Sequence, residues 1–304
     1  MITLICLVLV FCASYMLFKE YILALRGCKI RLKKAKDDPL FAILIPARDE
    51  SLVISDLLDS LKKQTYKIKP SDIYIIVESK KDPTVVIAKK RKINIVYRKD
   101  LTKQRKGYAL DDAVKEIIFS GKHYDAYFIF DADNVLDRNF LKEMVKSYKA
   151  GYDVGIGYRN TKNGNANIYA ASSSLTFSMI NTLGNNYKLK HNLCLTVSGT
   201  GFYIRGAILE DLGGYPFNSL TEDYEFSLYA VLNDLSTTYN TKAKYFDEQP
   251  TNYNLTIKQR TRWVKGYFSA RAIYYQALKK KASLKDKNYP SVYTTLVGVK
   301  PFVL

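Results

Sequence analysis

The chain has 304 residues, of which 47% are hydrophobic, and this composition excludes an intrinsically disordered protein. Its 47 Lys and Arg residues outnumber its 29 Asp and Glu residues, which gives a formal net charge of +18. This excess of positive charge favours an anionic partner, and a nucleic acid, a membrane surface and a phosphorylated substrate all fit.

The first predicted element is a membrane anchor. Residues 1–18 carry no charged side chain, and the apolar character resumes at residues 21–25 after Lys19 and Glu20. About 20 apolar residues span a bilayer, so we assign residues 1–25 to an anchor. A cleaved signal peptide is the alternative, but no basic residue precedes Lys19 and no small-residue cleavage site follows. The basic linker at residues 26–40 predicts, by the positive-inside rule, that the rest of the chain faces the cytosol.

Strand-like and helix-like segments then alternate. Apolar runs predict strands at residues 41–46, 73–77, 93–97 and 126–130, and apolar residues at helical spacing predict helices at 54–61, 110–118 and 140–148. This order predicts an α/β domain over residues 41–285, with a mostly parallel sheet and helices on both faces. Residues 286–304 turn apolar and are interpreted as the possible start of a further membrane-associated segment.

Polar residues follow several of these strands. Pro46, Glu78 and Asp131 each stand at the carboxyl end of a predicted strand, where ligands of such sheets bind. Asp131 and Asp133 need an explanation, since carboxylates beside a buried strand must be solvated, paired or bound to a cation. If the strand alternation continued to Asp133, both side chains would point to one side, with Ala132 opposite.

Four motifs follow one another along the chain: IPARDE at 45–50, FDADN at 130–134, LTED at 220–223 and QRTRW at 259–263. D-x-D alone is weak evidence for a particular protein family, but D-x-D, T-E-D and Q-x-x-R-W in this order are strong evidence. Residues 40–280 resemble the family 2 glycosyltransferases, in particular the membrane-bound branch with cellulose, hyaluronan and poly-N-acetylglucosamine synthases. The resemblance implies a GT-A-like fold and an inverting transfer from a UDP-sugar to a growing polysaccharide, at a plasma membrane of bacterial type.

On this resemblance, Asp131 and Asp133 hold Mg²⁺ or Mn²⁺. These ions prefer carboxylate ligands and keep part of their coordination shell for waters and phosphates. Bound there, such an ion would stabilise the departing diphosphate of the donor. The alternative is that one aspartate caps a helix beginning near Leu136, although Asn134 and Asp137 could do that instead.

The resemblance makes Asp223 the general base that takes the proton of the acceptor hydroxyl. Its neighbour Glu222 helps to position it. An acidic first turn of a helix is the structural alternative, and the two interpretations are compatible.

Two further motifs are expected near the acceptor and the diphosphate. Arg262 supplies a permanent positive charge for a phosphate, and Trp263 offers an apolar face to a sugar ring. The glycines of SGTGF at 198–202 allow a sugar to approach the backbone, and Phe202 could stack on that sugar. The alternative for SGTGF is that its glycines only allow the chain to turn tightly into the following strand. The full set expected here is Gly199, Thr200, Phe202, Glu222, Gln259, Arg262 and Trp263.

The donor nucleotide is expected at the ends of the first strands. Lys106, which precedes Gly107, resembles the family's lysine that touches the nucleotide, and a solvated charge run is the alternative. Glu78 stands where many relatives have an aspartate that contacts the uracil. The full set expected to bind the donor is Ala47, Arg48, Asp49, Glu78, Asp82, Lys106 and Asp131.

Other functions remain open at this stage. The acceptor could be a glycan or a lipid-linked group, so transfer of a single sugar to a lipid or polyprenyl phosphate is the second enzymatic hypothesis. A membrane-anchored nucleic-acid-binding protein fits the charge, but the sequence holds no recognised nucleic-acid motif, and we expect no nucleic acid. A pseudoenzyme is disfavoured by the intact Asp131, Asp133 and Asp223.

Overall fold

The computed structural model describes residues 6–8, 10–12, 14–15 and 38–297. Its strands are β1 (Phe41–Pro46), β2 (Ile73–Val77), β3 (Asn94–Tyr97), β4 (Ala126–Ile129), β5 (Val135–Leu136), β6 (Val154–Thr161), β7 (Phe202–Arg205) and β8 (Thr237–Asp247). Its longer helices are α2 (Ile54–Lys62), α3 (Thr84–Lys90), α4 (Lys106–Phe119), α5 (Phe140–Lys149), α6 (Ile168–Met179), α9 (Glu222–Leu232), α10 (Tyr253–Ser283) and α11 (Tyr289–Val297). Short helices are α7 (Asn186–Lys190) and α8 (Gly206–Asp211), and a π-helical turn spans Ile180–Asn185.

The strands form one mixed sheet in the order β3-β2-β1-β4-β7-β6-β8-β5. The first four in this order are parallel to their neighbours. β7 then enters between β4 and β6 in the reverse direction, and β5 runs antiparallel to β8. β6 and β8 are again parallel, so the prediction of a mostly parallel sheet holds for β1 to β4 and for the β6–β8 pair, and it fails where β7 and β5 run in the reverse direction.

Alternate residues of the parallel strands face opposite helical layers. In β1, Phe41, Ile43 and Ile45 belong to the core with α2, α3 and α5, whereas Ala42 and Leu44 belong to the core with α4. All five are fully buried. Because helices cover both faces, β1 is apolar throughout instead of alternating between apolar and polar residues.

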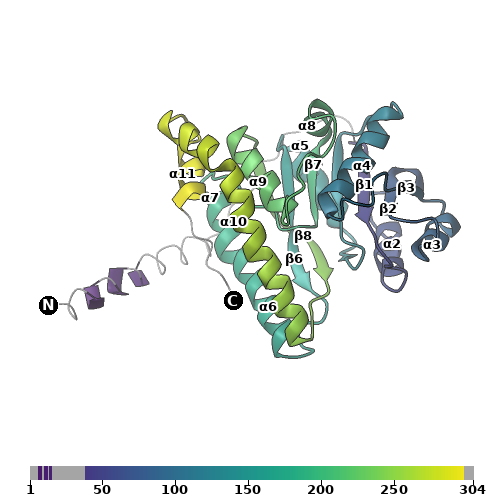
Figure 1. The fold of residues 1–304 in the computed structure, drawn as a ribbon, viewed down its shortest axis with the longest axis horizontal. Coiled ribbons are helices and arrows are strands. Elements are labelled where there is room, and N and C mark those ends of the chain that lie inside the picture. Colours follow the sequence, from purple (N-terminus) through teal and green to yellow (C-terminus); the bar gives the residue numbers. More distant parts are fainter. Residues whose placement is uncertain (1–5, 9, 13, 16–37, 298–304) are drawn as a thin grey trace.

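A third apolar cluster joins α9, α10 and α11. It includes Tyr224, Tyr267 and Val292, one from each helix. The long helix α10 runs along one side of the molecule beside α6 (Figure 1), and Arg260 of α10 donates a hydrogen bond to Ser172 of α6 at 2.9 Å. Through the third apolar cluster, the start of α9, where the T-E-D motif lies, packs against α10, which contains Q-x-x-R-W.

The helix expected near Leu136 begins later, at Phe140. Val135 and Leu136 instead pair with Phe246 and Tyr245 as β5, because a short strand closes the sheet edge at this point. The N–H of Asn139, the residue before the helix, donates a hydrogen bond to Asp137 Oδ1 at 2.9 Å. Neither aspartate of the D-x-D motif caps this helix.

The predictions for the two chain ends lie largely outside the described residues. Within the predicted anchor, residues 6–8, 10–12 and 14–15 are helical. Most of the 26–40 linker and residues 298–304 are outside the description. In the part of the chain that the structure describes, no helix combines the length and the apolar character needed to cross a membrane. The anchor therefore stays a prediction.

Candidate functional site

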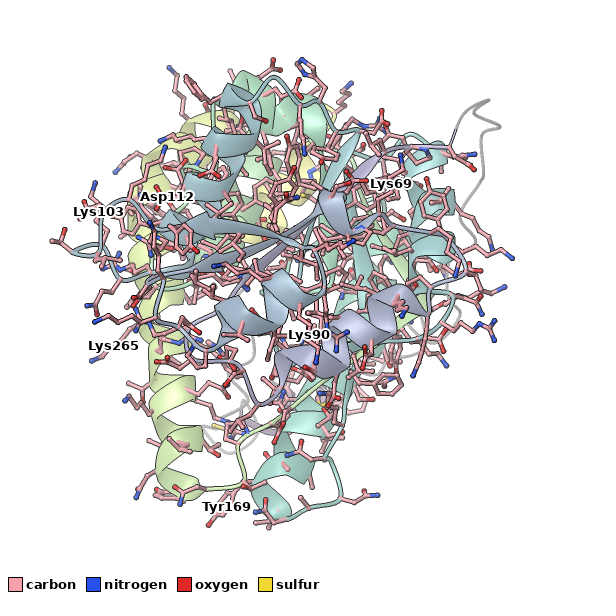
Figure 2. All side chains as sticks on the ribbon, turned by 90° about the vertical axis from the view of Figure 1, so that its right-hand side faces the viewer. Lys69, Lys90, Lys103, Asp112, Tyr169 and Lys265 are labelled. Atoms are coloured by element: carbon pink, nitrogen blue, oxygen red, sulfur yellow. The ribbon has the colours of Figure 1, made fainter. Side chains whose placement is uncertain are left out.

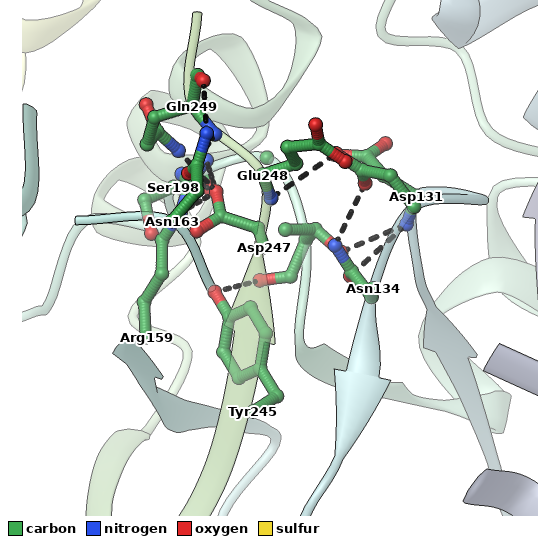
Figure 3. Close-up of polar contacts among 12 residues, drawn as sticks. Asp131, Asn134, Arg159, Asn163, Ser198, Tyr245, Asp247, Glu248 and Gln249 are labelled. Carbon is green, nitrogen blue, oxygen red and sulfur yellow. Dashed lines mark hydrogen bonds and ion pairs between the residues drawn. The ribbon is translucent and has the colours of Figure 1, made fainter. Parts of the chain in front are cut away.

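Asp131 and Asp133 lie in a turn that follows β4. The N–H of Asn134 donates to the carbonyl of Asp131 at 3.1 Å, so the strand alternation expected to reach Asp133 ends before it. Asn134 Nδ2 donates to Asp133 Oδ1 at 3.0 Å, and the N–H of Glu248 lies 3.4 Å from Asp133 Oδ2 (Figure 3). Burial, followed by the charges of Asp131 and Asp247, raises the pKa of Asp133 to about 6. The turn thus gathers negative charge that the protein does not fully balance.

Thr200 fixes the shape of this turn from the buried side. Its Oγ1 accepts a hydrogen bond from the Asp131 N–H at 2.9 Å and donates to Asn134 Oδ1 at 2.5 Å. Its carbonyl accepts from Tyr245 Oη at 2.9 Å. We expected Thr200 beside the acceptor, but its hydroxyl is already committed to the aspartate turn.

Phe202 does not face the site where we expected it to contact a sugar. It is 1% exposed in β7 and stacks with Phe226 of α9, with ring centroids 6.5 Å apart. The prediction that Phe202 stacks on a sugar is wrong, because β7 lies inside the sheet and turns this side chain into the core. Gly199, by contrast, has a φ of +80° and faces the site, since a Cβ on it would lie 3.7 Å from Asp223 Oδ2.

Lys106 connects three of the predicted motifs. Its Nζ donates to Asp131 Oδ1 at 2.5 Å and to the carbonyl of Gly199 at 2.8 Å, and lies 3.9 Å from Glu222 Oε1. Burial lowers the pKa of Lys106, but the charges of Asp131 and Glu222 outweigh burial and raise it. A solvated charge run is therefore the wrong interpretation of this lysine, which is the positive centre of an acidic site.

The residues expected to bind the nucleotide form a second group at the ends of β1 and β2. Arg48 and Glu78 form an ion pair, and the N–H of Asp49 donates to Asp82 Oδ2 at 3.0 Å. Asp49 has a φ of 56°, which turns the chain sharply after Ala47. The sequence correctly predicts that these residues come together, because parallel strands end at the same edge of a sheet.

Glu50 belongs to the site, although sequence reasoning missed it. Burial raises its pKa, and the charges of Asp131, Asp82 and Asp49 raise it further. Glu50 is thus close enough to both the nucleotide group and the aspartate turn for their charges to act on its carboxylate. The IPARDE motif contained a signal for it, since Glu50 directly follows Ala47, Arg48 and Asp49, which were assigned to nucleotide binding.

The sequence also gave no indication of a buried ion pair between Arg159 and Asp247. Arg159 of β6 donates from Nε to Asp247 Oδ2 at 2.7 Å and from Nη1 to the carbonyl of Ser198 at 2.9 Å (Figure 3). Gln249 Nε2 donates to the same Asp247 oxygen at 2.7 Å. The other oxygen, Oδ1, is buried and has no hydrogen-bond partner among the described residues. No local pattern reveals this pair, because its members are 88 positions apart.

The Q-x-x-R-W motif lies on α10 beside the T-E-D loop. Arg262 is exposed, and its Nη1 lies 3.5 Å from the carbonyl of Leu220, just before T-E-D. Trp263 is half-buried and packs edge-on against Phe177, with the ring centroids 6.0 Å apart and the ring planes at 76°. The face of Phe177 also carries the Arg159 guanidinium, 3.7 Å from the ring centroid. Gln259 Oε1 is buried without a hydrogen-bond partner in the described part of the chain.

The carboxylates present fit a divalent cation that takes part of its coordination from a ligand. Among the described residues, no group of three or more His, Cys, Asp or Glu side chains converges as a complete metal site. Asp131 and Asp133 nevertheless stand two positions apart in one turn, and burial first, then the charge of Asp131, raises the pKa of Asp133. Mg²⁺ commonly uses one or two carboxylates together with waters and substrate phosphates.

Proteins of known type resemble this chain over most of its length. It is 25% identical over 261 residues to a probable glycosyltransferase, YdaM of Bacillus subtilis, covering 82% of this chain and 60% of that protein. It is 26% identical over 229 residues to the poly-beta-1,6-N-acetyl-D-glucosamine synthase of Staphylococcus epidermidis, covering 74% and 54%. The chain thus spans little more than half of the length of these curated relatives.

Solved structures share the fold. A mannosyltransferase from Pyrobaculum calidifontis, in complex with GDP-Man and Mn²⁺, superposes with a TM-score of 0.61 at 16% identity, over 96% of this chain and 87% of that one. A fragment of S. aureus TarS in complex with UDP-GlcNAc gives a TM-score of 0.53 at 17% identity, over 84% and 70%. Residues 38–266, well over half of the chain, match the model of the family described as "Glycosyltransferase like family 2". The chain therefore belongs to this glycosyltransferase family and has its GT-A-like α/β fold.

Proposed function

We propose that the protein transfers a sugar from a UDP-sugar to a hydroxyl of a growing polysaccharide, with inversion at the anomeric carbon. The observation that carries this proposal is the position of Lys106, which bridges the aspartate turn, the Gly199 carbonyl and the T-E-D glutamate. D-x-D and T-E-D, far apart in sequence, thereby share one acidic site. The family match, the named polysaccharide synthase and the UDP-GlcNAc complex of TarS support it.

The proposed chemistry is a direct displacement. The acceptor oxygen forms a bond to the anomeric carbon while the bond from that carbon to the diphosphate oxygen breaks. Asp223 takes the proton of the acceptor hydroxyl, because a neutral sugar hydroxyl is a poor nucleophile. A divalent cation held by Asp131 and Asp133 would neutralise charge on the leaving UDP.

The second candidate is transfer of a single sugar to a lipid or polyprenyl-phosphate acceptor. Product length separates the two proposals. Polymer synthesis gives a ladder of products, whereas single transfer stops after one sugar on a defined acceptor.

We further propose that the protein is attached to a membrane through residues 1–25 and that its domain faces the cytosol. Exposed apolar side chains on two adjacent helices support a membrane near the domain. Ile168 and Leu175 of α6 are 75% and 64% exposed, and Phe268 of α10 is 57% exposed. Exposed lysines accompany these residues on α10, including Lys265, and would favour anionic lipid.

A nucleic-acid-binding function receives less support from the structure. Lys69, Lys90, Lys103 and Lys265 are all exposed but stand on separate elements around the molecule (Figure 2). Readers of nucleic acid usually collect basic residues on one face or along one helix. The site described above instead concentrates carboxylates, which repel phosphate unless a cation is bound.

The decisive experiment is a screen of UDP-sugars, with GDP-mannose as a comparison donor, for metal-dependent release of the nucleoside diphosphate by the purified protein. We expect one or few UDP-sugars to react in Mg²⁺ or Mn²⁺ and none in excess chelator. Asp133→Ala should abolish turnover, whereas Asp56→Ala, on the exposed face of α2, should not. Near-normal activity of Asp133→Ala without added metal would contradict the proposed cation site.

A further inference from the structure

The T-E-D loop is pressed against α10 at Gly266. A Cβ built on Gly266 would lie 2.6 Å from Oγ1 and 2.9 Å from Cβ of Thr221, and closer still to its Cγ2. Real Cβ atoms do not approach other heavy atoms within 3.0 Å, so only glycine allows Thr221 to sit this close. Thr221 is buried and immediately precedes Glu222 and Asp223.

α9 and α10 make a second contact nearby, at the residue after Gly266 and three residues after Thr221. The rings of Tyr224 on α9 and Tyr267 on α10 are 4.8 Å apart and inclined at 32°. Both are buried in the cluster that α9, α10 and α11 share. Arg271 Nη1 donates to Tyr267 Oη at 3.2 Å and to the carbonyl of Thr295 on α11 at 2.7 Å. The residues on both sides of Glu222 and Asp223 are thus fixed by α10.

Asp223 is held relative to the rest of the site by contacts of α9 with other elements. Ser227 Oγ donates to the Asp223 carbonyl at 2.8 Å and accepts from the Val197 N–H at 2.9 Å, which holds α9 to the segment before Gly199. The docking of Thr221 on Gly266 ties α9 to a different element. That element, α10, also carries Gln259, Arg262 and Trp263 one to two turns earlier.

We propose that Gly266 is a positioning residue for the Asp223 carboxylate, and that the Thr221–Gly266 contact couples the Q-x-x-R-W helix to the general base. The inference rests on the proposed function, because it takes Asp223 as that base. A general base must lie about 2.6–3.2 Å from the oxygen it deprotonates. A displacement of about 1 Å can cost roughly 10²-fold in rate.

The test is Gly266→Ala, compared with Gly184→Ala as a matched control. A Cβ on Gly184 meets no atom within 4 Å, so the control makes the same chemical change without the clash. For Gly266→Ala we expect the transfer rate to fall about 10²-fold. The affinity for UDP in Mn²⁺, measured by calorimetry, should stay within about twofold of wild type, because the nucleotide groups lie on β1, β2 and α4. The control should match wild type in both measurements.

A second variant tests the steric origin of the effect. Thr221→Ala removes Oγ1 and Cγ2, the atoms nearest the added methyl group, and Oγ1 has no hydrogen-bond partner among the described residues. The Cβ of residue 221 stays 2.9 Å from the added methyl group, so the double variant Thr221→Ala, Gly266→Ala should recover about tenfold of the lost rate but not all of it. No recovery would overturn the proposal. So would an equal loss of UDP affinity and transfer in Gly266→Ala, since that would indicate damage to the whole site.

A readout independent of activity separates this inference from the proposed function. Hydrogen–deuterium exchange of residues 219–226 should increase in Gly266→Ala, remain unchanged in Gly184→Ala and recover in the double variant. If wild type transferred no sugar from any donor, the proposed function would fail, and the exchange pattern would still decide the Thr221–Gly266 coupling. If Gly266→Ala does not fold, Thr221→Ala alone replaces it, because it removes the two atoms that pack most closely on Gly266. Slower transfer with unchanged UDP affinity then supports the inference, and unchanged transfer overturns it.

Discussion

Lys106 and Asp131 form the short contact at the centre of the site, with Nζ 2.5 Å from Oδ1. Lys106 opens α4 and Asp131 follows β4, so the contact joins the nucleotide side of the sheet to the predicted metal ligand. The lysine partly neutralises an aspartate that a cation is expected to use. A cation bound at Asp131 would therefore compete with Lys106 for the same negative charge.

The first prediction follows from this competition. Replacing Lys106 with Met removes a positive charge near the cation site, so affinity for Mn²⁺ alone should rise severalfold, while affinity for UDP should fall. At an effective dielectric constant of about 20, unit charges about 4 Å apart interact by roughly 4 kcal/mol before screening, which is ample for such a change. Calorimetric titration with Mn²⁺ checks this. Lys115→Met, which removes a lysine paired with Asp111 on the exposed side of α4, is the control. Weaker Mn²⁺ binding in Lys106→Met would count against the competition.

The second prediction concerns Asp223. Asp223→Asn is nearly isosteric, so UDP affinity should be almost unchanged, while transfer should fall by about 10² to 10⁴-fold because an amide cannot accept the hydroxyl proton. Metal binding should survive in this variant but weaken in Asp131→Asn. NMR coupling constants should also show a β-linked product from an α-linked donor. Normal transfer in Asp223→Asn, or an α-linked product, is incompatible with the proposed mechanism.

The third prediction concerns stability and pH. Burial raises the pKa of Glu222 to about 7, the Lys106 charge opposes this, and the Asp223 charge adds to it. Because the folded-state pKa lies above the ordinary value of 4.5, the stabilisation from protonated Glu222 is complete below about pH 4.5 and is lost as the pH rises through about 7.

Glu222→Gln cannot ionise, so it should gain stability relative to wild type as the pH increases from 5 to 8. Each pKa unit corresponds to about 1.4 kcal/mol, which predicts a relative gain on the order of 1–3 kcal/mol. Thermal melts of both proteins across this range provide the measurement. Glu116→Gln, at an exposed position of α4, should show no such trend. A difference between Glu222→Gln and wild type that does not change with pH would contradict the prediction.

The fourth prediction concerns membrane attachment. Removal of residues 1–25 should release the protein from membranes and leave UDP binding intact, because the first strand of the sheet begins at Phe41. Sedimentation with membranes and calorimetry with UDP are the two measurements. A truncated protein that still sediments would show a second attachment. Adding Leu175→Lys and Phe268→Lys to the truncated protein would then test the exposed surface of α6 and α10.

The sequence by itself determined the elements that local pattern controls. In β1 and β2 every residue is apolar because helices cover both faces, and the helices at Ile54–Lys62 and Phe140–Lys149 show their buried residues at helical spacing. The order of the four motifs was enough to indicate the family that the match over residues 38–266 shows. Strand ends at a common edge also led to the expectation that Pro46, Glu78 and Asp131 share one edge of the sheet, and the residues that follow β1 and β2 do meet there, as Arg48 pairs with Glu78.

The tertiary structure alone decided which side chains meet across the sheet. Arg159 and Asp247 pair because β6 and β8 are neighbours, and Phe202 is buried because β7 lies between β4 and β6. Gly266 meets Thr221 because α9 and α10 pack on a shared core. Hydrophobic periodicity reports the face of an element that is buried, but it carries no information about the element that covers that face. Contacts between residues distant in sequence depend on the order and direction of strands and on helix packing, and these are fixed only when the whole core assembles.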